Sequence, residues 1–131
     1  MHLGVLEFEL LLDESFSLKD KRSVVKSLKD RLHREHLVSV SEVAGHDHMR
    51  FAVLGVSVVA PTATRASTVL DAIERKFDQG TEYRPGGRRR TVLSSQDLFR
   101  GQLESGEPEW SEADSAEFES LAEQAIEEAE S

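Results

Sequence analysis

The sequence predicts one α+β domain, with the element order strand, helix, strand, strand, helix, strand, followed by an acidic tail. Three observations lead to this prediction: a strictly alternating apolar pattern near the N-terminus, two segments with helical apolar spacing, and a change of composition after residue 100. A chain of 131 residues has the length of a single domain with a modest core.

The first strand is predicted at residues 3–12, where Leu6, Phe8 and Leu10 alternate with Glu7 and Glu9. Such alternation is typical of a strand with one buried face. From residue 18 to about residue 36 the apolar period becomes helical, and Ser17 is suited to cap the helix. The residues predicted to share the buried face of this helix are Leu18, Val25, Leu28 and Leu32.

A strand at residues 37–43, a loop at 45–49 and a strand at 51–59 are predicted next. A second helix is predicted with Pro61 in its first turn and Gly80 at its end. A turn at residues 85–87 then leads into a last strand at about 89–98. The apolar residues at helical spacing in the second helix are Ala66, Val69, Leu70, Ile73 and Phe77.

This order matches the ferredoxin-like βαββαβ arrangement, in which two helices cover one face of an antiparallel sheet. The strand at 51–59 is apolar on both faces, because Phe51, Val53 and Val59 project away from the side of its other valines and Leu54. We therefore expect a sister subunit or the chain's own tail to cover the second face. The predicted oligomer interface consists of Phe51, Val53 and Val59.

The charge of the chain is divided between its two parts. Residues 1–100 hold all sixteen Lys and Arg and fourteen Asp and Glu, whereas residues 101–131 hold eleven acids and no base. We predict a domain at 1–100 and an acidic linker and tail at 101–131. Such a tail can dock on the basic surface of its own body or on a basic partner.

The tail has two interpretations. It forms an acidic amphipathic helix, capped by Ser111 and Asp114 with Trp110 as an extra anchor, or it is a charged segment that keeps the protein in solution. The residues at helical spacing are Phe118, Leu121, Ala122, Ala125, Ile126 and Ala129.

Several functional classes are disfavoured by composition. The chain has no cysteine, which excludes disulfides, thiolate metal sites and a Cys nucleophile. Glu7 and Glu9 interrupt the N-terminal apolar run, which is not expected of a signal peptide. No stretch has the ~20 apolar residues that span a bilayer. We expect a cytoplasmic protein that has no cofactor and does not bind a membrane.

The first 60 residues resemble DUF503, a family of small bacterial proteins of unknown function that is also called YlxP-like. The resemblance is carried by residues 4–7 (GVLE), 17–28 (SLKDKRSVVKSL), 40–43 (VSEV), Asp47 and 52–56 (AVLGV). It implies a ferredoxin-like fold and no established activity. Family members are often encoded beside genes for transcription, translation initiation and ribosome maturation, which implies an RNA or ribosome context.

Two basic clusters are candidates for contact with nucleic acid. The first is a stripe within about 80° of arc on the first helix, and it can neutralise phosphates irrespective of base identity. The second is an arginine-rich turn, where glycines and guanidinium groups suit a polyanion. The stripe consists of Lys19, Arg22, Lys26, Lys29 and His33, and the turn carries Arg84, Arg88, Arg89 and Arg90. Each cluster has a structural alternative: a solvated helix flank for the stripe, and a docking site for the acidic tail for the turn.

No catalytic motif is recognised. His46, Asp47 and His48 form a weak metal pattern, for which surface histidines are the simpler interpretation. For hydrolytic chemistry, the only acids near each other in the segment that resembles DUF503 are Glu42 and Asp47. No Ser, His and Asp fall in a recognisable triad motif.

Two functions are therefore expected. The first is a non-catalytic module that binds structured RNA or a ribosomal subunit through the helix stripe and the arginine-rich turn. The sheet face does not suit RNA, because the first strand presents Glu7 and Glu9 there and only Phe51 is aromatic on the strand at 51–59. The alternative is a homo-oligomeric protein-interaction module.

Overall fold

The computed structural model describes residues 1–13, 17–102 and 112–130, with side chains described from 120 to 129 in the last stretch. The chain divides into two compact units, Met1–Leu98 and Phe99–Ser131. Each unit is described by itself.

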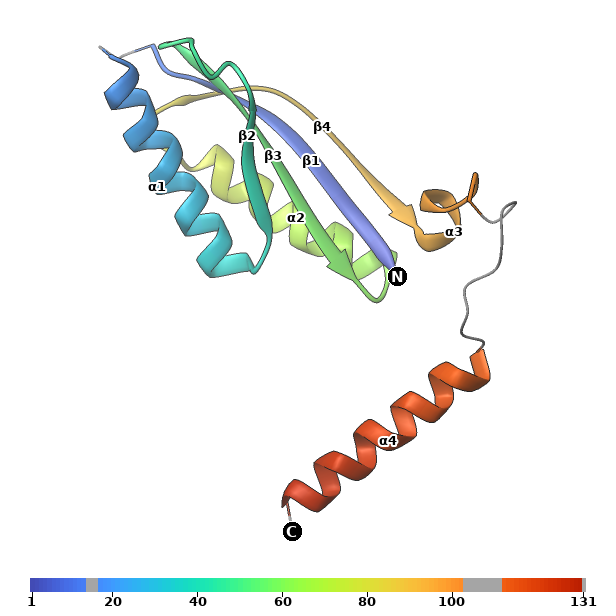
Figure 1. Cartoon of the computed structure of the whole chain (residues 1–131). Coiled ribbons are helices and arrows are strands. Elements are labelled where there is room, and N and C mark those ends of the chain that lie inside the picture. The colour runs from blue at the N-terminus through green and yellow to red at the C-terminus, as the bar shows by residue number, and fades with distance from the viewer. Residues whose placement is uncertain (14–16, 103–111, 131) are drawn as a thin grey trace. The chain divides into compact units, whose positions relative to one another are not determined.

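The first unit is a four-stranded antiparallel sheet with helices α1 and α2 on one side, as Figure 1 shows. The strands lie in the order β2-β3-β1-β4, so the two central strands come from the two halves of this unit, β1-α1-β2 and β3-α2-β4. This is the predicted ferredoxin-like βαββαβ fold. The elements are β1 (His2–Leu11), α1 (Leu18–His36), β2 (Ser39–Ala44), β3 (Phe51–Ala60), α2 (Ala63–Asp78) and β4 (Arg84–Ser94).

The hydrophobic core lies between the sheet and the two helices. Each strand contributes the alternate residues that face the helices, and each helix contributes one apolar stripe. α1 packs beside β2, whereas α2 packs against β1, β3 and β4. The buried residues of the sheet are Leu6, Phe8, Leu10, Ala52, Leu54, Val56, Val58 and Ala60, and those of the helices are Val25, Leu28, Leu32, Ala66, Leu70, Ile73 and Phe77.

Both helices begin at a hydroxyl side chain. The predicted cap Ser17 is confirmed, since its Oγ accepts a hydrogen bond from the backbone N–H of Asp20 at 3.1 Å. Thr62 caps α2 in the same way through the N–H of Arg65, so Pro61 precedes the cap and the prediction that it lies in the first turn is wrong. β2 begins two residues later than predicted, because Leu37 adopts a left-handed conformation at φ 53° and ends α1.

The predicted turn at residues 85–87 is wrong, because these residues lie inside β4. The actual connection is at 79–83, where a Cβ on Gly80 would collide with the Tyr83 ring. Gly86 passes so close to β1 that a Cβ there would lie 3.1 Å from the backbone oxygen of Glu9, where the β1–β4 register shifts. β4 ends at Ser94 rather than near residue 98, and the short helix α3 (Ser95–Leu98) follows.

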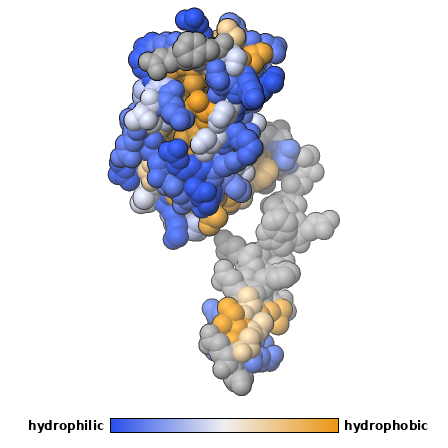
Figure 2. Space-filling model, turned by 90° about the vertical axis from the view of Figure 1, so that its left-hand side faces the viewer, coloured by the Kyte–Doolittle hydropathy of each residue, from blue (hydrophilic) through white to orange (hydrophobic). Residues whose placement is uncertain are grey.

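The described part of the tail contains the helix α4 (Glu112–Glu130), which agrees with the helical interpretation. Leu121 and Ile126 are exposed on it, and Figure 2 shows hydrophobic side chains of this helix beside hydrophilic ones. The predicted cap Ser111 and the anchor Trp110 lie outside the described residues, and the side chain of Phe118 is not described.

Candidate functional site

The predicted cation stripe lies on the solvent side of α1. Lys19, Arg22, Lys26 and His33 are exposed, and Lys29 is half-buried. At 100° per residue, the stripe is centred roughly 110° around the helix from the buried side. Among the residues that the structure describes, Lys19, Arg22 and Lys29 take part in no ion pair.

Two members of the stripe already have partners. Lys26 Nζ donates a hydrogen bond to Asp30 Oδ2 at 2.9 Å, which raises the pKa of Lys26 and lowers that of Asp30. The Nδ1 atom of His33 lies 2.8 Å from the backbone oxygen of Val38 and tethers the end of α1 to the start of the next segment. The pair Lys26–Asp30 is exposed and therefore weak, so a phosphate can replace the carboxylate.

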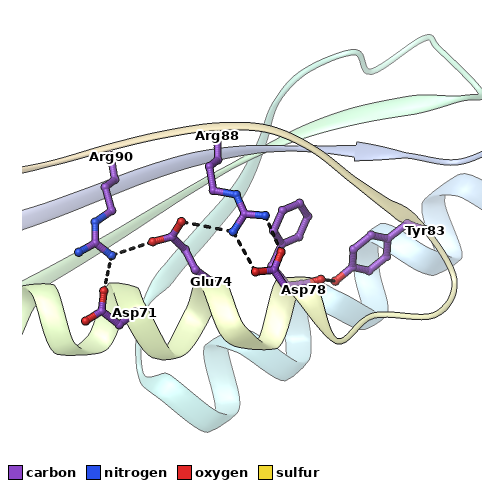
Figure 3. A network of polar contacts seen from close by, with 7 residues as sticks. Asp71, Glu74, Asp78, Tyr83, Arg88 and Arg90 are labelled. Carbon is purple, nitrogen blue, oxygen red and sulfur yellow. Dashed lines mark hydrogen bonds and ion pairs between the residues drawn. The ribbon is translucent and has the colours of Figure 1, made fainter.

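The arginines predicted in a flexible turn lie instead on the edge strand β4, and all four form ion pairs. Figure 3 shows that Arg88 and Arg90 reach over α2 to three acids on one side of that helix. Arg90 Nη1 lies 2.7 Å from Asp71 Oδ1 and 2.7 Å from Glu74 Oε2. Arg88 Nη1 lies 3.3 Å from Glu74 Oε1. Glu74 therefore lies between two guanidinium groups and joins the strand to the helix.

Arg88 is also part of an aromatic stack. Its Nη2 donates to Asp78 Oδ1, which holds the pKa of Asp78 below its ordinary value, and its guanidinium lies 4.7 Å from the centre of the Phe77 ring. The rings of Phe77 and Tyr83 are stacked with centroids 5.5 Å apart. Tyr83 donates a hydrogen bond from its hydroxyl to the backbone oxygen of Phe77 at 2.6 Å, and burial raises the pKa of Tyr83 to about 12. Arg88 is thus partly a structural residue.

Arg84 and Arg89 form more exposed pairs. Arg84 Nε donates to Asp13 Oδ2 at 2.9 Å, which lowers the pKa of Asp13. Arg89 points to the other face of the sheet, where its Nη2 lies 2.8 Å from Glu7 Oε2. The arginine side chain is 82% exposed and the glutamate side chain 37% exposed. A guanidinium in this position remains accessible to a second anion.

The most unusual charged group is the buried Lys21, which was not predicted as a functional residue from the sequence. Its side chain is 1% exposed, although it belongs to α1. Nζ lies 3.0 Å from Glu42 Oε1 on β2, donates a hydrogen bond to the backbone oxygen of Gly45, and lies 3.4 Å from that of His46. The sequence held one sign of this burial: Lys21 lies four residues before Val25, and therefore on the apolar side of α1. Lys21 therefore holds the β2–β3 loop onto the first helix.

The predicted metal pattern is not brought together. His48 packs its ring on Phe51, with centroids 4.5 Å apart, while the backbone of His46 faces Lys21. Among the side chains that the structure describes, no three His, Asp or Glu are grouped as metal ligands. Glu42 pairs with Lys21, so it is already engaged by a buried cation.

The side of the sheet away from the helices, here called the open face, carries the predicted interface residues. Phe51 and Val53 are half-buried there, and Val59 is 67% exposed. A shallow hollow of about 250 Å³ lies beside them, with Val5, Val43, Gly55 and Ser57 among its lining residues. The register places these residues on the open face: Leu3, Val5, Glu7, Glu9, Leu11, Ser41, Val43, Phe51, Val53, Gly55, Ser57, Val59, Arg89, Thr91 and Leu93.

No helix in the described part of the chain is both long and apolar enough to cross a membrane.

The fold and these surfaces define a small α+β protein of the ferredoxin-like class, with a basic helix and an open sheet face. The chain belongs to DUF503, a family described as proteins of unknown function, which matches residues 3–85. This confirms the resemblance seen in the first 60 residues and extends it to the start of β4.

Two similar proteins illustrate this relationship. An uncharacterized protein YlxP of Bacillus subtilis (strain 168) is 26% identical over 80 residues, which cover 61% of this chain and 87% of the relative. A de novo designed protein with a ferredoxin fold, LFR1 1, whose structure was solved by NMR, aligns with a TM-score of 0.43 and 16% identity, over 72% of this chain and 87% of that one. The fold assignment here rests on the strand order and pairing.

Proposed function

We propose that the protein is a non-catalytic cytoplasmic module that binds structured RNA, including that of a ribosomal subunit, through the exposed side of α1. The observation that carries this proposal is the row of cations on one helix flank. Lys19, Arg22 and Lys29 have no paired acid among the described residues, and Lys26 has only an exposed one. Cations repeated along a helix suit the phosphates of a nucleic acid backbone, since each contact releases a counterion.

The arginines of β4 contribute less in this proposal than the sequence suggested. Arg88 and Arg90 are about 30% exposed and are held by the acids of α2, so a phosphate would have to displace those carboxylates. Arg84 and Arg89 are more exposed, and surface ion pairs are weak enough to exchange partners. The primary contact is therefore α1, with Arg84 as a secondary contact, because Arg89 lies on the open face beside Glu7.

The experiment is a salt titration of binding to ribosomal subunits and to a structured RNA fragment, followed by fluorescence anisotropy or filter binding. About four phosphate contacts give a slope of log Kd against log salt near 3 to 4. The double variant Lys19→Glu and Arg22→Glu should lower this slope by about 2 and weaken binding strongly. The matched control is Arg65→Glu with Arg75→Glu on α2, which makes the same change in net charge on another helix.

The control variant should lose much less affinity than the stripe variant. Equal losses for both would mean that only net charge matters, and that α1 is not the contact. Absence of binding by the wild-type chain at low salt would refute the proposal.

A further inference from the structure

The open face of the sheet has an apolar surface that continues across strands. Val59 on β3 pairs in register with Leu3 on β1, which pairs in turn with Leu93 on β4. At the other side of the face, Val43 is 49% exposed and lies over Gly55. Side chains of this kind are placed to make a face-to-face contact between two sheets.

The size of this face is that of a specific interface. Four strands of six to eleven residues, spaced about 4.8 Å apart, present roughly 600 Å² in projection. The accessible surface is larger than the projection, because side chains make it rough. A standard protein interface buries about 800 Å² on each partner. One whole sheet face is therefore enough for a stable contact.

The charges on this face indicate which partner fits. Glu7 and Glu9 lie near its middle, and Arg89 pairs with Glu7. No described residue forms an ion pair with Glu9, while Arg89 remains 82% exposed. RNA phosphates would meet two carboxylates here. The acidic tail has no Lys or Arg to offer Glu9. A second copy of the chain brings an Arg89 for each Glu9.

We propose that the open face docks against the open face of a second copy, with the apolar rows packed together and Arg89 of each copy beside Glu9 of the other. A two-fold axis makes such a contact self-complementary, so each ion pair occurs twice. This inference does not depend on RNA binding, because it uses the face of the sheet opposite α1.

The first test is the mass of the full-length chain in solution, measured by sedimentation equilibrium at tens of micromolar. The wild type should have twice the mass of one chain. Val59→Lys should give the monomer mass, since Val59 is 67% exposed and the lysine places a charge in the apolar row of Val59, Leu3 and Leu93. The matched control Leu37→Lys changes an 86% exposed leucine at the end of α1 and should remain a dimer. Circular dichroism shows whether each variant is folded.

The second test uses two charge-reversed chains. Arg89→Glu places two acids opposite each other in its own dimer, and Glu9→Arg places two arginines opposite each other. Each variant alone should dimerise at least about tenfold more weakly than the wild type, because like charges then face each other across the interface. An equimolar mixture should form a heterodimer, since both cross-pairs become attractive.

A monomeric wild type would overturn the proposal, and so would a Val59→Lys variant that keeps the mass of the dimer. If both charge variants remain monomeric in the mixture, the proposed pairing of Arg89 with Glu9 is wrong. A heterodimer that forms only on mixing would support it, because a purely structural effect of either substitution would not be rescued by the other chain.

Discussion

Replacing Lys21 by methionine should strongly destabilise the protein, although Lys21 is a charged residue on a helix with one side exposed to solvent. Methionine keeps most of the side-chain volume but removes the ammonium that faces Glu42 and the backbone oxygen of Gly45. The carboxylate of Glu42 is only 17% exposed and would remain without its cation. The oxygen of Gly45 would also lose its donor.

The magnitude follows from these partners. Breaking a buried ion pair by removing one partner costs roughly 3–5 kcal/mol. Glu42 keeps some contact with water, so we expect a loss near the lower limit, about 3 kcal/mol in the free energy of unfolding. Replacing Glu42 by Gln as well removes the stranded charge, so Lys21→Met with Glu42→Gln should recover about 1–2 kcal/mol of that loss.

The assay is urea unfolding followed by circular dichroism, with hydrogen exchange at the amides of residues 45–50 as a local readout. Lys19→Met is the matched control, because Lys19 is exposed on the same helix and should change the stability by less than about 0.5 kcal/mol. The expected pattern is a large loss for Lys21→Met, faster exchange in the loop, and partial recovery in the double variant.

A loss below about 1 kcal/mol for Lys21→Met would show that Lys21 is not held in a buried ion pair. If the double variant loses as much stability as Lys21→Met and Glu42→Gln lose separately when added together, Lys21 and Glu42 do not interact.

Four further predictions concern other contacts. Burial raises the pKa of Tyr83 to about 12, and Tyr83 is the one tyrosine in the chain, so the tyrosine absorbance change of the folded protein should be centred near pH 12. The free energy of unfolding should fall as pH rises from about 10 to 12, and Tyr83→Phe should flatten that slope. The hydrogen bond from Arg88 lowers the pKa of Asp78, so the stabilisation from this ion pair is complete above the ordinary pKa of aspartate and is lost as pH falls through the lowered value. Arg88→Met should therefore reduce the slope of the free energy of unfolding against pH in the acid range. Phe77→Ala should cost about 3–5 kcal/mol in urea unfolding, since the ring is fully buried between Phe8 and Arg88. Deleting residues 101–131 should raise affinity for RNA beyond the effect of net charge, judged against a chain whose tail acids are scrambled in order, if the acidic tail competes for the basic surface.

Elements of the fold could be predicted from the sequence where they depend on residues close together in the chain. Alternation in β1 and the hydroxyl of Ser17 determine a strand and a helix start from residues only a few positions apart. The open face was also predictable, because Phe51 and Val53 lie on the opposite side of β3 from its buried residues.

Contacts between distant segments could not be predicted in this way. The role of Lys21 depends on Glu42 and on carbonyls of a loop 24 and 25 residues further along the chain. The glycines of β4 were interpreted as a turn, but Gly86 instead allows β4 to pass close to the backbone of Glu9 on β1. Arg88 and Arg90 were predicted to be available for ligands, because the contacts that bring them to the acids of α2 form only when the strand packs beside that helix.

The two edges of the sheet limit how copies of this protein can associate. β4 presents three consecutive arginines along one edge, and β2 at the other edge is short and interrupted by a bulge. Charged side chains and bulges on edge strands prevent a sheet from adding further strands from neighbouring molecules. Growth of a continuous β-structure through many chains is therefore blocked in both hydrogen-bonding directions. The folded protein can therefore carry an apolar sheet face without offering a hydrogen-bonding template for fibrils at its edges.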